Sequence, residues 1–255
     1  MIRNPVGLAT LINREMVRTF SIINQVIWPP VITTVLYVFV FGLALGSRIK
    51  NVQGVSYSEF LIPGLIMLQV IDQTYSESSS SVFQGRFMGW IQELLVAPLS
   101  ALELVTGYIV AGIVRAFVIA ALITILGAIF VHAAPHNWPL YLFAIVIVAT
   151  LFSALGIVFG LLAEKFDHIA VLTTFAITPL VFVGGVFTST QFLPPLVRAI
   201  SMFNPMFHMI NAFRYSYIGR GDAPLGTSLV VVMTLCVAAV AAALRMTALG
   251  YKLRN

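Results

Sequence analysis

The sequence contains few charged residues for its length. Only 9% of its 255 residues are Asp, Glu, Lys or Arg, whereas 60% are hydrophobic. A soluble domain carries roughly 25% charged residues, because water must solvate its surface. The scarcity of charge therefore excludes an ordinary soluble domain and indicates that apolar residues face the hydrocarbon of a bilayer. We expect one all-α integral membrane domain over residues 1–255.

Several motifs of enzymes and cofactor sites are also missing. The chain has no G-x-x-x-x-G-K-[ST] loop for the phosphates of ATP, and no H-E-x-x-H or paired cysteines for zinc. With one cysteine, Cys236, no intrachain disulfide is possible. The serines at 78–81 lack a G-x-S-x-G context, so a serine hydrolase is not expected. The sequence thus predicts no catalytic residues, no cofactor and no metal site. Since its basic residues form no run, nucleic acid is not an expected partner.

Long apolar runs are what the sequence has instead, and each is long enough to cross a membrane. The six runs are 26–45, 61–82, 104–131, 140–163, a fifth from residue 169, and 228–249. The fifth meets Pro179 and then Gly184-Gly185, so we expect its helix to break. The more polar stretch 188–227 predicts short or re-entrant helices. In the fourth run, the G-x-x-x-G step at 156–160 permits close contact with another helix.

Residues 1–24 predict an amphipathic helix before the first span. Asn4 is a good N-cap, and Pro5 suits the first helical turn. Apolar residues recur at helical spacing on one face, namely Leu8, Leu11, Ile12, Met16, Phe20 and Ile23. The opposite face carries Arg14 and Arg18, so we expect this helix to lie in the membrane interface and contact lipid. The alternative is an ordinary helix packed against a neighbour.

The distribution of Lys and Arg predicts the orientation in the membrane. Six spans place both termini on one side, with the basic residues Arg3, Arg14, Arg18, Arg86, Lys165, Arg245, Lys252 and Arg254. The other side holds Arg48, Lys50, Arg198, Arg214 and Arg220. Because cytoplasmic segments are richer in Lys and Arg, the first helix and the tail at 250–255 are expected in the cytoplasm.

Charged and polar residues within the apolar runs predict a polar group inside the membrane. Asp72 in the second run and Arg115 in the third lie at a similar depth, because each is about ten residues from the cytoplasmic end of its helix. We expect these two to pair, with the further polar side chains Gln69, Gln73 and Glu77 nearby. Two interpretations stay open. The group is either a polar lining for a transport path or a buried ion pair that fixes helix register.

A series of short motifs resembles those of ABC-2 type permeases. The motifs are Phe60-Leu61-Ile62-Pro63-Gly64-Leu65, Glu93-Leu94-Leu95-Val96-Ala97-Pro98-Leu99-Ser100, Gly184-Gly185-Val186-Phe187, Leu193-Pro194-Pro195, Asn204-Pro205 and Arg214-Tyr215. Each motif is weak alone, but their order and the hydropathy around them cover nearly the whole chain. Within the family, the chain is most similar to the YadH-type inner-membrane transport permeases.

The resemblance implies an architecture and partners. It implies six spans in the bacterial inner membrane, cytoplasmic termini, a homodimer, and two separate ATP-binding subunits. The loop 87–100 would be a coupling helix that contacts the ATPase, through the residues Trp90, Glu93, Leu94, Leu95 and Pro98. One departure is that 84–90 has only Arg86 as a charged residue, where relatives have an acidic and basic cluster.

A gate on the outer side is predicted from composition after the fifth span. Gly184 and Gly185 permit a sharp change of backbone direction, and Phe187 and Phe203 are too apolar for a free loop. For Arg214 two roles are open, pairing with an anionic cargo or placing its guanidinium at the membrane interface.

The function that fits these features is the membrane subunit of an ATP-driven exporter. The cargo would be an amphipathic, lipid-linked, glycan or drug-like molecule. The alternative is an ion-coupled secondary transporter that uses Asp72, Glu77 and Arg115.

Overall fold

The structure is a computed structural model that describes residues 4–44, 46, 51–90 and 99–251. Over these residues the chain forms helices joined by loops and turns, with an isolated bridge between Val52 and Val55, which confirms the all-α prediction. The helical elements are α1 (Pro5–Ser21), α2 (Ile23–Val26), α3 (Trp28–Ala44), α4 (Tyr57–Phe87), α6 (Ala101–Val131), α7 (Trp138–Leu162), α8 (Phe166–Leu172), the π-helix η1 (Thr173–Ile177), α9 (Thr178–Val183), the 3-10 helix η2 (Thr190–Phe192), α10 (Pro195–Phe203), α11 (Pro205–Ile218) and α12 (Leu225–Ala248).

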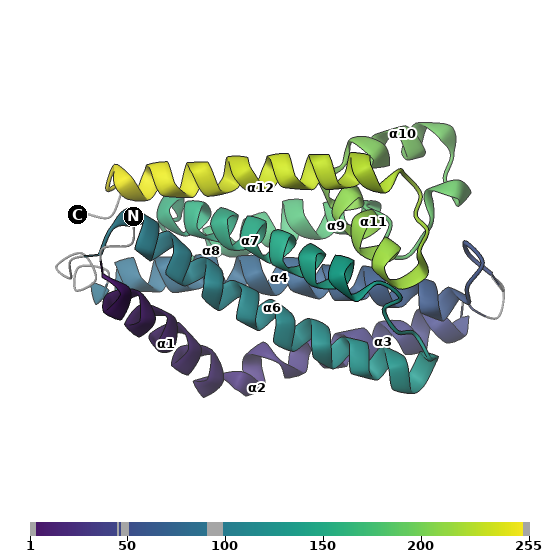
Figure 1. Ribbon diagram of the computed structural model, residues 1–255, viewed down its shortest axis with the longest axis horizontal. Helices are drawn as coiled ribbons and strands as arrows, with labels where there is room; N and C mark the ends of the chain where they lie inside the picture. Colours follow the sequence, from purple (N-terminus) through teal and green to yellow (C-terminus); the bar gives the residue numbers. More distant parts are fainter. Residues whose placement is uncertain (1–3, 45, 47–50, 91–98, 252–255) are drawn as a thin grey trace.

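The long helices lie roughly along one axis of an elongated bundle (Figure 1). One end of the bundle holds the start of α1, the end of α4, the start of α6 and the end of α12, and we call it the α1 end. The opposite end holds α10 and α11, and we call it the α11 end. The first and last described helices therefore share one end, as an even number of spans requires. Which side of the membrane each end faces remains a prediction.

Among the described residues, five helical segments are long and apolar enough to cross a membrane. They are Ile23–Gly42, Ala101–Val131, Trp138–Leu162, Phe166–Val183 and Leu225–Ala248. The second predicted run, which became α4, is not among them, because polar side chains such as Asp72 and Glu77 interrupt its apolar stretch. The structure therefore gives five spans by composition, and the sixth remains a prediction.

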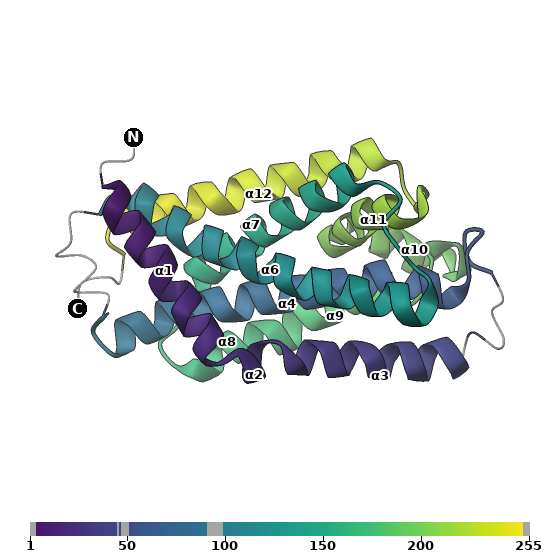
Figure 2. The same cartoon turned by 60° about the horizontal axis from the view of Figure 1, so that its bottom comes forward.

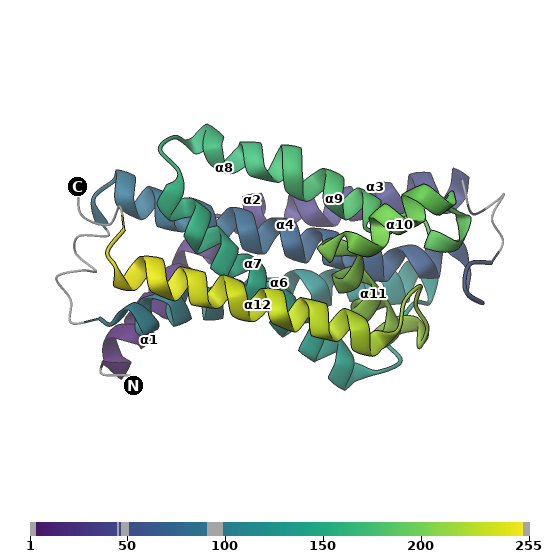
Figure 3. The same cartoon turned by 90° about the horizontal axis from the view of Figure 1, so that it is seen from above.

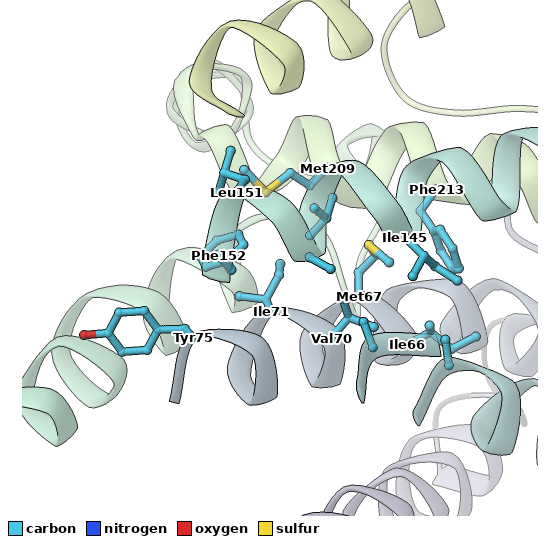
Figure 4. Close-up of a cluster of buried hydrophobic side chains, with 14 of the residues drawn as sticks. Ile66, Met67, Val70, Ile71, Tyr75, Ile145, Leu151, Phe152, Met209 and Phe213 are labelled. Atoms are coloured by element: carbon cyan, nitrogen blue, oxygen red, sulfur yellow. The ribbon is translucent and has the colours of Figure 1, made fainter. Parts of the chain in front are cut away.

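Helix α4 is buried over much of its length, most continuously in its first half. A reciprocal capping box starts it, in which Ser56 Oγ accepts from the Glu59 amide and Glu59 accepts from the Ser56 amide. Its apolar first half packs against α7 and α11, as Figure 4 shows for Ile71, Phe152 and Phe213. These side chains are fully buried, and burying one stabilises the fold by roughly 1.5–3 kcal/mol relative to exposure.

The end of α4 lies beyond the second predicted run, which covered 61–82. The helix continues to Phe87, and Phe83 is buried against the ring of Phe166, with 4.7 Å between the ring centroids. Arg86 Nη1 donates to the carbonyls of Leu161 and Ala163, at 2.7 and 3.0 Å. The carbonyls at the C-terminus of α7 have no partner within their own helix, and the guanidinium of Arg86 supplies one. This contact stabilises the last turn of α4 and explains why α4 extends to Phe87.

The fifth predicted run is continuous across Pro179, contrary to the expected break. The proline ring removes a backbone donor and would clash with the carbonyl four residues earlier, at Phe175. Phe175 lies in the π-helix η1, whose wider turn accommodates the proline without ending the helix. The chain turns instead at Gly184-Gly185, where Gly185 has a φ of +92° that favours glycine.

Short helices follow that turn, as predicted. Within the stretch 188–227, helix α11 begins at Pro205 after the N-cap Asn204 and ends at Ile218. Helix α10 packs against α11 and leaves apolar side chains such as Phe203 exposed. Whether these helices re-enter the membrane remains a prediction.

Helix α1 confirms the predicted cap and alters the predicted face. Asn4 Oδ1 accepts from the Gly7 amide at 2.9 Å. The helix crosses α6 obliquely and packs on it (Figure 2), which agrees with the packed alternative. Its buried residues are Leu11, Glu15 and Thr19, so a carboxylate lies in the contact. Its position relative to the membrane interface is not tested.

Candidate functional site: a polar furrow along α4

Polar side chains of α4 divide between two sides of the helix. At about 100° per residue, Asp72 and Glu77 project about 140° apart. Asp72 shares its side with Gln69, Gln73, Ser76 and Ser80. Glu77 and Ser81 instead point toward α1. A single helix thus presents one polar side to open space and one to a neighbouring helix.

The first side forms a furrow made of two cavities that share Asp72. A cavity of about 200 Å³ lies among α3, α4, η1 and α9, and one of about 440 Å³ lies among α4, α8 and η1. Figure 3 shows α8 and α9 running beside α4, away from α12. The furrow residues are Pro29, Pro30, Thr33, Tyr37, Leu68, Gln69, Asp72, Gln73, Ser76, Ser80, Phe166, Asp167, Ile169, Ala170, Thr173, Thr174, Ile177, Thr178, Val181 and Phe182.

Asp72 is the charged group in the middle of this furrow. Within the described chain it has no hydrogen bond and no ion pair. The π-helical residues Thr173 and Thr174 line the furrow near it. Single π-helical turns occur often at functional sites, because they shift side chains away from the regular helical pattern. An unpaired carboxylate in a membrane bundle usually marks a ligand or ion path.

The second side of α4 joins α1 and α6 through a balanced set of charges. Arg18 Nη2 lies 3.1 Å from Glu77 Oε2, and Arg18 Nε lies 3.4 Å from Glu15 Oε2. Ser81 Oγ donates to Glu15 at 2.8 Å. Arg115 Nη1 donates to Thr19 Oγ1 at 3.0 Å. We call these residues the α1 network, and its two glutamates balance its two arginines.

The expected pair between Asp72 and Arg115 is wrong. Asp72 faces the furrow, whereas Arg115 is 2% exposed and lies against Thr19 of α1. The cavity beside Arg115 is about 10 Å³, which is too small for a cargo headgroup. The role of Glu15 was not predicted, because a carboxylate within an amphipathic surface helix is ordinarily solvated. Its spacing of three residues from Arg18 was the available signal.

Glu15 gives a prediction about stability. Glu15→Gln keeps a hydrogen-bond acceptor for Ser81 but leaves the α1 network with an excess positive charge. We expect a loss of about 1.5–3 kcal/mol, the range for hydrogen bonds to charged groups. Thermal unfolding of the purified protein measures it, with the exposed Asp167→Asn as a charge-matched control. Equal melting temperatures for the two variants would show that Glu15 does not anchor α1.

Arg214 is part of a buried assembly at the α11 end. It is 0% exposed, and its Nη2 donates to the Gly185 carbonyl at 2.7 Å. Its Nη1 lies 3.7 Å from Asp222 Oδ2, and its guanidinium lies 3.9 Å from the centre of the Phe60 ring. Burial lowers the pKa of Arg214 to about 10, and the Asp222 carboxylate opposes that change. The guanidinium therefore stays charged at neutral pH, sealed from both lipid headgroups and cargo.

The predicted outer gate residues do not form one cluster within the chain. Gly184 and Gly185 lie beside Phe207 of α11. Phe187 packs against Tyr37 and Phe41 of α3, with ring centroids 5.4 and 4.7 Å away. Phe203 is 90% exposed on α10. The role of Asp222, which also accepts from Gln53 Nε2 at 2.8 Å, was missed because no local pattern marks it.

Of the predicted coupling residues, Trp90 lies within the described chain. Its ring stacks under the Arg14 guanidinium at 5.1 Å. Glu93, Leu94, Leu95 and Pro98 lie outside the described residues. Beyond them, Glu103 accepts from the Asn4 amide and from the Ser100 amide. Helix α1 and its cap therefore contact the chain on both flanks of 91–98.

Comparison with known proteins places this geometry in context. A family model described as "ABC-2 type transporter" matches residues 7–218. The chain is 40% identical over 233 residues to the inner membrane transport permease YadH of Escherichia coli strain K12, covering 91% of each chain. It is 28% identical over 221 residues to nodulation protein J of Rhizobium leguminosarum bv. viciae, covering 84% of this chain and 82% of the relative.

Proposed function

The chain belongs to the ABC-2 type transporter family, and we propose that it is the membrane-spanning subunit of an exporter driven by separate ATP-binding subunits. The observation that carries the proposal is the furrow, where an unpaired Asp72 lines open space along the central helix of an apolar bundle. Helix α4 would be the sixth span, covered by protein and by a transport path where it is polar. Both termini would lie in the cytoplasm.

The furrow also supports a homodimer. Two of the five candidate spans, Ile23–Gly42 and Phe166–Val183, have the fewest buried residues. In each, 17% of the residues of the apolar window are buried, which is less than in the other three. These two spans border the furrow on either side of α4. A second copy covering them would close two furrows into a path between protomers. Two copies would bring two ATP-binding subunits to the α1 end.

Ion-coupled transport is less well supported by this geometry. That alternative needs Asp72, Glu77 and Arg115 in one site. Glu77 is paired with Arg18, and Arg115 is sealed beside Thr19. Of these three residues, only Asp72 faces the furrow. A separate source of energy, such as ATP hydrolysis by a partner subunit, therefore suits the arrangement better.

The two ends of the bundle would have different roles. At the α1 end, Trp90 and the segment containing Glu93, Leu94, Leu95 and Pro98 would contact the ATP-binding subunit. At the α11 end, Gly184, Gly185, Phe187 and Phe203 would border the exit, with Phe203 meeting the second copy or the outer leaflet. Arg214 would hold this end together and would not bind cargo.

The test co-expresses the chain with a candidate ATP-binding cassette subunit from the same organism. The purified chain alone is expected to hydrolyse no ATP, because it lacks a phosphate loop. Co-expression should give a complex that hydrolyses ATP. Leu94→Asp with Leu95→Asp should abolish co-purification while membrane insertion persists, since two charges oppose an apolar contact.

Leu249→Asp is the matched control, because Leu249 is exposed and follows α12 at the same end. ATP hydrolysis by the chain alone would contradict the proposal. Unchanged co-purification of the double variant would remove the loop from the interface.

A further inference from the structure

We infer that the furrow binds a positively charged, amphipathic cargo, with the Asp72 carboxylate pairing with its cationic group. The inference rests on the proposed exporter function and specifies the chemical class of its cargo. It narrows the choice left by the sequence, which fits anionic lipid-linked glycans and cationic drug-like molecules equally.

The charge that the furrow presents is negative. Its charged lining residues are Asp72 and Asp167, and no Lys, Arg or His lines it within the described chain. A phosphate or carboxylate cargo would meet like charge and find no guanidinium or ammonium to replace its lost hydration. A cation would meet the opposite charge at the middle of the path.

The buried basic side chains that an anionic cargo would need lie away from the furrow. Arg115 and Arg214 are the arginines of the inner core, and they are 2% and 0% exposed. Arg115 points toward α1, on the other side of α4 from Asp72. Arg214 is committed to Gly185 and Asp222 at the α11 end. Both buried arginines therefore lie away from the furrow, whereas the carboxylate of Asp72 lies in it.

Asp72 lacks a partner within the described chain, although an unpaired carboxylate in a membrane bundle is energetically costly. Such residues normally pair with another group or face a ligand path. Within the described chain Asp72 has neither a hydrogen bond nor an ion pair. A bound cation would supply that partner. Pairing would remove the cost of an unpaired carboxylate at this position, and this gain would contribute to the free energy of binding.

The walls of the furrow fit the rest of such a cargo. The cavity of about 200 Å³ has apolar walls formed by Leu68, Val181 and Phe182, and Tyr37 adds an aromatic ring. Aromatic faces attract cations as well as apolar groups. Gln69, Gln73 and the hydroxyls of η1 supply hydrogen bonds. The cavities of about 200 and 440 Å³ together reach the size of a drug-like binding site.

The experiment compares two probes of matched shape and opposite charge, tetraphenylphosphonium and tetraphenylborate. Saturable binding of each radiolabelled probe is measured on the purified complex with its ATP-binding subunits. Tetraphenylphosphonium should bind the wild type, and Asp72→Asn should weaken it at least tenfold. Asp72→Glu keeps the charge and should restore most of the affinity. Glu59→Gln, on the same helix but in the exposed cap, should leave affinity unchanged.

The inference is overturned if tetraphenylborate binds as tightly as tetraphenylphosphonium, or if neither shows saturable binding. It is also overturned if Asp72→Asn leaves the affinity for tetraphenylphosphonium unchanged. ATP hydrolysis by the same complex is measured in parallel. A complex that hydrolyses ATP but fails the probe test refutes the cargo class alone, whereas failure to form an active complex refutes the exporter proposal.

Discussion

Replacing Arg214 by glutamine is expected to lower the free energy of unfolding by about 3–5 kcal/mol, the range for breaking a buried ion pair. The variant leaves Asp222 in the interior without its counter-charge, and it leaves the Gly185 carbonyl without its donor. It also removes the cation that lies over the Phe60 ring. These contacts join α11 to α4 and to the turn after α9, so the whole α11 end should loosen.

Equilibrium unfolding in mixed micelles measures this effect. Arg198→Gln is the matched control, because Arg198 is an exposed arginine on the neighbouring α10. Asp222→Asn should also destabilise the protein, and the double variant should lose less than the sum of the single losses. Strict additivity, or a loss under about 1 kcal/mol for Arg214→Gln, would show that the pair does not hold this end together.

The local features of the fold were predictable from the sequence. The N-cap at Asn4 and the helix that follows it depend on neighbouring residues, and the structure confirms both. The start of α11 near Met206 was predictable for the same reason, because Asn204-Pro205 is a local signal for a helix start. Hydropathy located the apolar runs, because the length of a span is fixed by the bilayer.

The rotation of each helix about its axis was not predictable in the same way. Depth along a span follows from counting residues, which is why Asp72 and Arg115 looked like partners. Which neighbour each residue faces depends on how the helices pack. Arg115 faces α1, a helix that the sequence placed flat in the interface. Glu15 acquires its role only through that packing.

Arg214 illustrates the same limit at the α11 end. It lies in the stretch 188–227, which is more polar than the apolar runs and favoured a position at the surface. Its burial depends on Gly185, which is 29 residues away, and on Phe60 of α4. Contacts of this kind form only when distant segments come together. The sequence therefore identified Gln69, Asp72 and Gln73 as candidate site residues. It did not identify which residues lie beside them, because the predicted partner of Asp72 was wrong.

Gly156→Val is expected to prevent α7 from packing on α4, with a loss of at least 3 kcal/mol or no folded protein. A Cβ at Gly156 would lie 2.8 Å from Ser78 Cβ and 2.9 Å from the Tyr75 carbonyl oxygen. At Gly160, the next small residue on that face, it would lie 2.7 Å from the Ser79 carbonyl oxygen. These neighbours are backbone or close to it, so the helices themselves must separate. Overpacking a core costs typically 1–3 kcal/mol, and more where backbone must move.

The control for this prediction is Gly226→Val near the start of α12, where no atom lies within 4 Å of an added Cβ. Both variants place a β-branched residue in a helix, so the difference between them isolates the contact with α4. The yield of monodisperse protein and its melting temperature provide the comparison. Since Asp72 lies on an adjacent side of α4, a partly folded Gly156→Val variant should also lose binding of tetraphenylphosphonium. Equal stability of the two variants would mean that α7 does not approach α4 this closely, and that the position of Asp72 is fixed by α3 and η1 instead.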